Sequence, residues 1–103
     1  MRAENYDGKL VNILGLETVV RAKLPIIDLV HWATVGREGI TTSGNDREHS
    51  AESLHYKGLA IDVRTGDLEY GEVTRLISEL NSELGDSWDV VREPTHIHIE
   101  YDP

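Results

Sequence analysis

The chain has 103 residues, 39% of them hydrophobic and 28% charged, which is the size and composition of one globular domain covering residues 1–103. Its formal net charge is −9, from 19 acidic and 10 basic residues, and this argues against binding to nucleic acid or to an anionic membrane. There is no cysteine, so a metal site has to use His, Asp and Glu, and no apolar run is long enough to span a membrane.

The N-terminal third is expected to be helical. Apolar residues recur at helical spacing from Leu10 to Ala33, and His31 falls on a face of this stretch. Pro25 should end or kink a helix, so the pattern predicts two short helices rather than one long one. The segment GITTSGN then predicts a short strand from Ile40 to Thr42 that runs into a polar loop.

The rest of the chain alternates between strands and one helix. LAIDV predicts a strand with Asp62 on the face opposite the apolar residues. An amphipathic helix is expected from Glu72 to Leu84, ended by Gly85. WDVV and HIHIEY predict two last strands, separated by a bend at Pro94. This order predicts an α+β fold with a small, mostly antiparallel sheet.

Two segments carry residues suited to a metal site. SLHYKGLAID contributes His55 and Asp62, and REPTHIHIE ends with His96 and His98 on one face of a strand. Two imidazoles and one carboxylate suit Zn²⁺ and leave a coordination position for a water molecule that zinc can activate. Hydrolysis then needs a base and a donor to the oxyanion. Glu93 fits the base, and whichever of His96 and His98 does not bind zinc fits the donor.

Each of these residues also has a purely structural interpretation. A pair such as His55 and Asp62 occurs often by chance, and exposed histidines are common on a solvated strand. Glu100 shares the histidine face and suits a salt bridge as well as a role in the site. A non-haem iron oxygenase also uses two histidines and a carboxylate, but its first His and carboxylate are much closer in sequence. The two motifs together favour zinc.

These motifs resemble a known family. SLHYKGLAID matches the S-x-H-x-x-G-x-A-x-D signature of the zinc D-Ala-D-Ala carboxypeptidases and related peptidoglycan peptidases. HIHIEY resembles their closing H-x-H strand, which is also found in the zinc-binding domain of Hedgehog proteins. ITTSGN resembles the strand and loop upstream of the first ligand. The resemblance covers about residues 40 to 102 and implies a fold like that of Hedgehog proteins and DD-peptidases.

The resemblance implies zinc on His55, Asp62 and a histidine of the last strand, with Glu93 as catalytic base. Family members that end in E-P-W-H point to His96 as the third ligand, whereas members that end in H-x-H point to His98. The I-H-I-E ending favours His98, which leaves His96 as the partner of the oxyanion or the substrate.

The resemblance also implies which residues bind substrate and what is cut. Ser53 belongs to the signature, and Arg47 stands one place later than the Arg of the family's S-G-Y-R, which contacts the substrate carboxylate. The implied function is zinc-dependent hydrolysis of a peptidoglycan stem peptide by a monomeric carboxypeptidase or L,D-endopeptidase. The alternative is a non-catalytic, Hedgehog-like zinc-binding module that binds a wall fragment or a protein partner.

The opening MRAENYDGKLVNILG lacks the apolar segment of a secretory signal peptide, and no wall-binding module accompanies the domain. A small peptidase of this kind resembles the endolysins of bacteriophages. We therefore expect synthesis in the cytoplasm without a signal peptide and action at the bacterial cell wall after phage-type release, with export from a bacterium by another route as the alternative.

Overall fold

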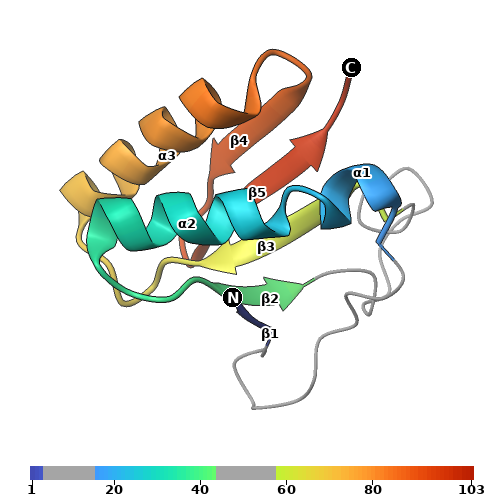
Figure 1. Ribbon diagram of the computed structural model, residues 1–103. Coiled ribbons are helices and arrows are strands. Elements are labelled where there is room, and N and C mark those ends of the chain that lie inside the picture. Colours follow the sequence, from blue (N-terminus) through green and yellow to red (C-terminus); the bar gives the residue numbers. More distant parts are fainter. Residues whose placement is uncertain (4–15, 44–57) are drawn as a thin grey trace.

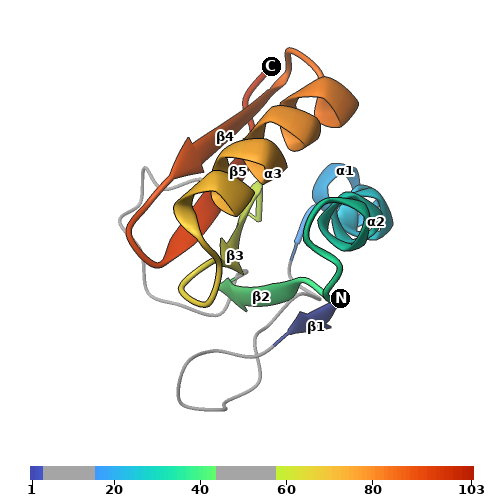
Figure 2. The ribbon, with the colours of Figure 1, turned by 90° about the vertical axis from the view of Figure 1, so that its left-hand side faces the viewer.

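The computed structural model describes residues 1–3, 16–43 and 58–103, which form five strands and three helices. In chain order these elements are β1 (Arg2–Ala3), α1 (Thr18–Arg21), α2 (Leu24–Val35), β2 (Ile40–Ser43), β3 (Ala60–Arg64), α3 (Tyr70–Leu84), β4 (Trp88–Arg92) and β5 (His96–Tyr101). The strands form one sheet in the order β1-β2-β3-β5-β4. The three helices lie on the same face of this sheet (Figures 1 and 2). We call the opposite face, on which none of the described helices lies, the open face.

The sheet is mixed. β2–β3, β3–β5 and β5–β4 are antiparallel pairs, whereas β1 pairs with β2 in parallel. A bulge between Thr41 and Ser43 interrupts the pairing of β2 with β3. The α+β prediction is confirmed, and the parallel edge comes from β1, which the sequence did not predict because two residues carry no periodic signal.

Two helices occupy the segment for which a broken helical stretch was predicted. α1 ends at Arg21 and α2 begins at Leu24, so Pro25 stands in the first turn of α2. In that turn its missing N–H costs no intrahelical hydrogen bond, so Pro25 begins a helix rather than ending one. α2 is closed by Gly36, whose N–H donates to the carbonyl of Trp32 at 2.9 Å.

α3 begins and ends at recognisable signals. At its start the Glu72 carboxylate accepts a hydrogen bond from the N–H of Glu69 at 3.0 Å, as part of a capping box. At its end Gly85 follows the last helical residue, as predicted. Its buried residues form one stripe, made of Val73, Leu76, Leu80 and Leu84.

The core lies between the helices and the sheet. Alternate residues of β3 and β5 enter it, and Ile61, Val63, Ile97 and Ile99 are all 0% exposed. Full burial of one such side chain stabilises the fold by roughly 1.5–3 kcal/mol. Because side chains alternate along a strand, the residues between these four project from the open face. Within the described ranges, no helix has both the length and the apolar character needed to cross a membrane.

Candidate metal centre

The open face carries the polar residues of β3 and β5 in neighbouring rows. Asp62 on β3 pairs with His98 on β5, and His98 pairs on its other side with Val91 on β4. In the adjacent row Arg64 pairs with His96. Residues directly opposite each other in an antiparallel ladder project from the same face of the sheet. The backbone register therefore brings Asp62 and both histidines together.

The carboxylate of Asp62 lies between the two imidazoles. Its Oδ1 is 3.0 Å from Nδ1 of His98, and its Oδ2 is 3.7 Å from Nε2 of His96. The other ring nitrogen of His96 lies 3.1 Å from the hydroxyl oxygen of Thr95. The side chains of Asp62, His98 and His96 are 14%, 21% and 28% exposed. Partial burial strengthens their polar contacts, while solutes still reach the group.

His98 has a carboxylate at each ring nitrogen. Nδ1 faces Asp62, and Nε2 is 3.1 Å from Oε1 of Glu100. The hydrogen bond that Nδ1 of His98 donates to Asp62 raises the pKa of His98 above its ordinary value of 6.5, although desolvation of the ring opposes this. The negative charges of Asp62 and Glu100 raise the pKa further. The two carboxylates therefore make the surroundings of His98 favourable for positive charge.

These donors fit a zinc ion by type and by spacing. Imidazole nitrogen and carboxylate oxygen are both zinc ligands, and neighbouring ligand atoms of a tetrahedral zinc are about 3.3 Å apart. The distance between Asp62 Oδ1 and His98 Nδ1 is 3.0 Å. A metal-bound histidine generally donates its second N–H to a carboxylate, and Glu100 accepts from His98 in that way. Asp62 and His98 therefore suit a metal, with Glu100 orienting the imidazole.

Glu93, the predicted base, lies in the turn between β4 and β5. Its N–H donates to the carbonyl of His96 at 2.9 Å, so the two residues are neighbours through the backbone. Its side chain is exposed and lines a groove of about 520 Å³ together with Tyr70 and Arg92. Within the described part of the chain, no hydrogen bond joins the Glu93 carboxylate to His96 or His98.

The predicted residues His55, Arg47 and Ser53 lie outside the described residues. The description resumes at Gly58, the glycine of the SLHYKGLAID signature, which has a φ of 74°. Its carbonyl accepts a hydrogen bond from the N–H of Glu17 at 2.9 Å, just before α1. The signature segment thus enters β3 through a left-handed glycine that is tied to the helical layer.

Glu100 is the residue whose role the sequence left open between a salt bridge and the site. The structure shows that Glu100 contacts His98, which the sequence alone did not decide. The alternation along the strand that places the two histidines on one face places Glu100 on that face as well. Glu100 further belongs to a group of three carboxylates with Asp89 and Asp102, whose ligand atoms lie within 4.8 Å of one another. This group has no imidazole and is mostly exposed, as is common for acidic side chains.

Comparison with known proteins gives a family. Residues 16–100 match the model of the Hedgehog amino-terminal signalling domain. The chain is 33% identical over 75 residues to the Tiggy-winkle hedgehog protein of Danio rerio and 35% identical over 78 residues to the Sonic hedgehog protein of Danio rerio. Each alignment covers 73% of this chain and 18% of the relative. The Indian hedgehog protein of Gallus gallus is 41% identical over 56 residues, which is 52% of this chain and 13% of that protein.

The chain therefore spans less than a fifth of the length of these relatives. No solved structure gives a significant match.

The predictions of a bacteriophage endolysin, of a peptidoglycan substrate and of action at the bacterial cell wall are wrong. The matches are hedgehog proteins of vertebrates, and nothing in them points to a cell-wall enzyme. The error has a physical reason. The two motifs predict a metal site and the strands that hold it, and HIHIEY resembles strands of both families, so the motifs carry no information about the substrate. The substrate-directed S-G-Y-R pattern is the one from which the sequence departs, at Asn45 and Asp46.

Proposed function

The chain belongs to the Hedgehog amino-terminal signalling domain family, and from this membership we propose that it is a zinc-binding module whose open face binds a protein partner. The observation that carries the proposal is the Asp62–His98 pair, which is 3.0 Å apart and partly buried on that face. The surrounding residues support a binding role, and the matched family is described as a signalling domain.

In this proposal Asp62 and His98 hold zinc, and His55 is the third ligand. His55 lies outside the described residues, so its assignment is based on its place in the SLHYKGLAID signature. When bound, zinc supplies a cross-link whose binding free energy adds to the free energy of folding. Glu100 holds the His98 ring in place through Nε2, and His96 flanks the second oxygen of Asp62 at 3.7 Å.

A protein partner suits the open face because an apolar side chain is exposed beside the metal centre. Val91 is 43% exposed and lies directly beside His98 in the ladder. A second exposed group lies on the helical side of the sheet, near the turn of the β4–β5 hairpin. There Tyr70, at the start of α3, is 76% exposed, and the guanidinium of Arg92 lies 4.0 Å from its ring centroid. Tyrosine and arginine dominate the binding energy of many protein interfaces, and the 520 Å³ groove between them offers a pocket for a partner's side chain.

Hydrolysis of a peptide bond is a second candidate, favoured by the position of Glu93 beside His96. When bound, zinc supplies a water of lowered pKa and polarises a carbonyl group. Glu93 then takes the proton of the attacking water, and the imidazole of His96 donates a hydrogen bond to the oxyanion. The exposed Glu93 carboxylate has to turn towards the metal centre for this role.

Zinc affinity tests the metal part of the proposal. Chelator-treated protein is titrated with Zn²⁺ in a calorimeter, together with the variants Asp62→Asn, Glu100→Gln and Asp86→Asn. We expect Glu100→Gln to weaken zinc binding about 10–100-fold because it orients a ligand, and Asp62→Asn to weaken it more. Asp86 is an exposed carboxylate just after α3, and its loss should leave the affinity unchanged. Equal zinc affinity in Asp62→Asn and Asp86→Asn contradicts the proposal.

Photo-crosslinking tests the partner part and separates the two candidates. A photoreactive leucine analogue replaces Val91 on the open face or, as a control, Glu83 on the exposed side of α3. A crosslinked protein that forms only from position 91 and is lost in Asp62→Asn supports binding through the metal-dependent face. No product specific to position 91 contradicts it. Turnover of a peptide library that Glu93→Gln abolishes, with zinc retained, establishes hydrolysis instead.

A further inference from the structure

The helix α2 carries apolar residues on the side that it turns to solvent. Five exposed residues recur there at helical spacing, so they lie along one line of the helix surface. We call them the outer stripe, which consists of Pro25, Leu29, Trp32, Ala33 and the capping Gly36. Leu29 is 68% exposed and Trp32 is 51% exposed. α3, in the same layer of the fold, has the polar residues Arg75, Ser78 and Ser82 opposite its buried stripe, as is usual for a surface helix (Figure 2).

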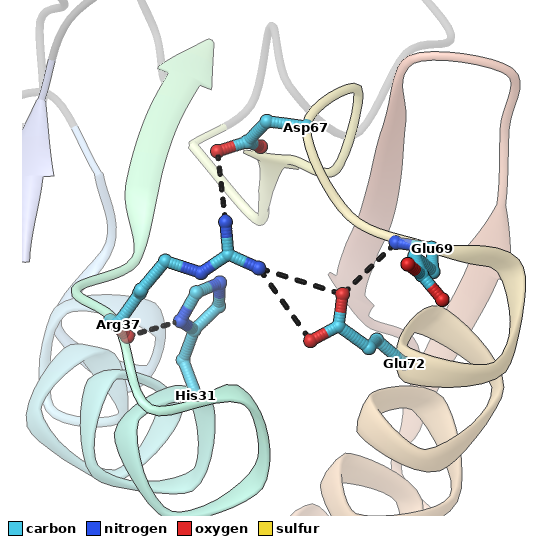
Figure 3. A network of polar contacts seen from close by, with 5 residues as sticks. All are labelled: His31, Arg37, Asp67, Glu69 and Glu72. Atoms are coloured by element: carbon cyan, nitrogen blue, oxygen red, sulfur yellow. Dashed lines mark hydrogen bonds and ion pairs between the residues drawn. The ribbon is translucent and has the colours of Figure 1, made fainter.

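A network of polar contacts holds the C-terminal end of α2 against α3. The backbone carbonyl of Arg37 is 2.6 Å from Nδ1 of His31, which is 4% exposed (Figure 3). A carbonyl only accepts hydrogen bonds, so Nδ1 of His31 donates. The guanidinium of Arg37 lies 3.8 Å from Asp67 and 3.4 Å from Glu72 of α3 (Figure 3). The outer stripe is therefore presented by a helix that is ordered before any partner binds, which lowers the cost of binding.

The outer stripe is the kind of surface that another protein covers. The two ionisable residues of α2, Asp28 and His31, both lie off the stripe, so the stripe itself carries no charge. A helix with apolar residues on all its sides is usually buried, and contiguous exposed apolar residues mark protein interfaces. Burial of Leu29 and Trp32 against a partner supplies the free energy for such a contact.

The order of side chains along the outer stripe is symmetric. The compact residues Pro25 and Gly36 stand at its ends, and the bulky residues Leu29 and Trp32 lie between them. Two copies of α2 that pack antiparallel place Leu29 of each copy against Trp32 of the other. A two-fold axis then passes midway between these two residues, as in an isologous dimer.

Charge also favours a second, antiparallel copy. Each chain has a net charge of −9, so two copies approach most easily where their surfaces carry no charge. α2 has no basic residue in its last turn to complement the negative pole of its helix dipole. Lys23 stands at the N-terminal end of α2. In an antiparallel pair it comes beside the negative pole of the second copy's helix.

We propose that the outer stripe is a homodimer interface, in which α2 packs antiparallel against α2 of a second copy of this chain. The 12 residues of α2 span about 18 Å and a helix is about 10 Å wide, so this pair buries less than the roughly 800 Å² per partner of a standard interface. We therefore expect a dissociation constant of about 10–100 µM. The sequence resemblance implies a monomer, but its motifs begin at about residue 40 and carry no information on α2. The dimer leaves the open face of each copy uncovered.

Sedimentation equilibrium of the full chain, with and without a chelator, tests the proposal. In about 0.15 M salt, which screens the repulsion between copies, the average mass should rise with concentration from 11.6 kDa towards twice that value. Leu29→Gln should weaken association roughly tenfold or more, and this exposed position leaves the core intact. Val91→Gln changes a comparable exposed apolar residue on the open face and should leave the dissociation constant unchanged.

Three results overturn the proposal. They are a mass of 11.6 kDa at every concentration, equal weakening by the two variants, and association that the chelator abolishes, which would place the contact at the metal centre.

A spin label tests the antiparallel arrangement. The chain has no cysteine, so a nitroxide on Ala22→Cys, an exposed position just before α2, reports on one site in each copy. With the two-fold axis between Leu29 and Trp32, a rise of about 1.5 Å per residue separates the two labels by about 25 Å along the helices. A pulsed EPR distance near that value supports the proposal. The strong line broadening of labels about 10 Å apart, as parallel helices require, or no coupling although the mass doubles, overturns it.

Discussion

Truncation of Ile99 tests how the core supports the open face. Ile99 is 0% exposed and lies in β5 between Ile61 of β3 and Val90 of β4. Ile99→Ala removes three carbon atoms, which is about 2.4 kcal/mol of transfer free energy at about 0.8 kcal/mol each. The cavity left behind between strands that are paired on both sides adds to this loss, so we expect a total of about 3–4 kcal/mol. Ile99→Val removes one carbon and should cost about 1 kcal/mol.

Urea unfolding of the metal-free protein, followed by tryptophan fluorescence, measures these changes. Trp88 is 6% exposed and reports on the same sheet. In a domain of this size about 1 kcal/mol corresponds to about 4–8 °C in Tm, so Ile99→Ala should melt roughly 15–25 °C below the wild type. Val91→Ala, at a side chain that is 43% exposed on the other face, should change stability by less than about 0.5 kcal/mol. The assignment of faces is refuted if Ile99→Ala costs no more than Val91→Ala.

Three further predictions use the same unfolding assay or its variation with pH. Gly58 has a φ of 74°, so Gly58→Ala should lower the free energy of unfolding by about 1–2 kcal/mol. Gly58→Asn should lower it by less, since asparagine tolerates this conformation better. Equal losses of stability in the two variants would argue against a left-handed glycine. The hydrogen bond that His98 donates to Asp62 raises the pKa of His98 above 6.5, so this pair should stabilise the metal-free protein fully below about pH 6.5 and progressively less as the pH rises through the folded-state pKa. Asp62→Asn should flatten this profile of unfolding free energy against pH, and an unchanged profile would contradict the contact between the two side chains. Glu72→Ala should lower the free energy of unfolding by about 1 kcal/mol because the N–H of Glu69 loses its capping partner. Glu72→Gln retains a hydrogen-bond acceptor and should lower it by less than about 0.5 kcal/mol. Equal losses in the two variants would show that the charge of Glu72 matters more than the cap.

Periodic features were predictable from the sequence. The alternation in HIHIEY correctly separates Ile97 and Ile99, which are buried, from His96 and His98, which face the open side. The apolar stripe of α3 and its end before Gly85 are equally regular, because packing against a sheet imposes a period of 3.6 residues. The position of Asp62 opposite His98 follows from register, which single-strand patterns do not contain.

Features that depend on residues distant in sequence were not predictable. β1 pairs with β2 across more than thirty intervening residues and has only two residues of its own. The cavity of about 170 Å³ at the end of β3 is lined by Arg2, Arg37 and Arg64, each of which looks like an ordinary surface charge in the sequence. The side chain of Glu93 is exposed in the β4–β5 turn, and a sequence motif does not contain the conformation of such a turn, so the role of Glu93 as base stays a prediction.

The substrate class was mispredicted for a different reason. Metal ligands and the strands that hold them constrain only a few side chains, and those constraints are the same whether a bound zinc serves hydrolysis or binding. The S-x-H-x-x-G-x-A-x-D segment therefore indicated a kind of site without indicating what the site acts on. The match of residues 16–100 to the Hedgehog amino-terminal signalling domain is the observation that contradicts a cell-wall enzyme.

The most direct test of the proposed metal centre is a crystal structure of zinc-treated protein with diffraction data collected on both sides of the zinc absorption edge. We expect one strong anomalous peak within bonding distance of Asp62 and His98, with Glu100 hydrogen-bonded to the far nitrogen of the imidazole. No peak there, or a peak only at the carboxylate group of Asp89, Glu100 and Asp102, would contradict the assignment.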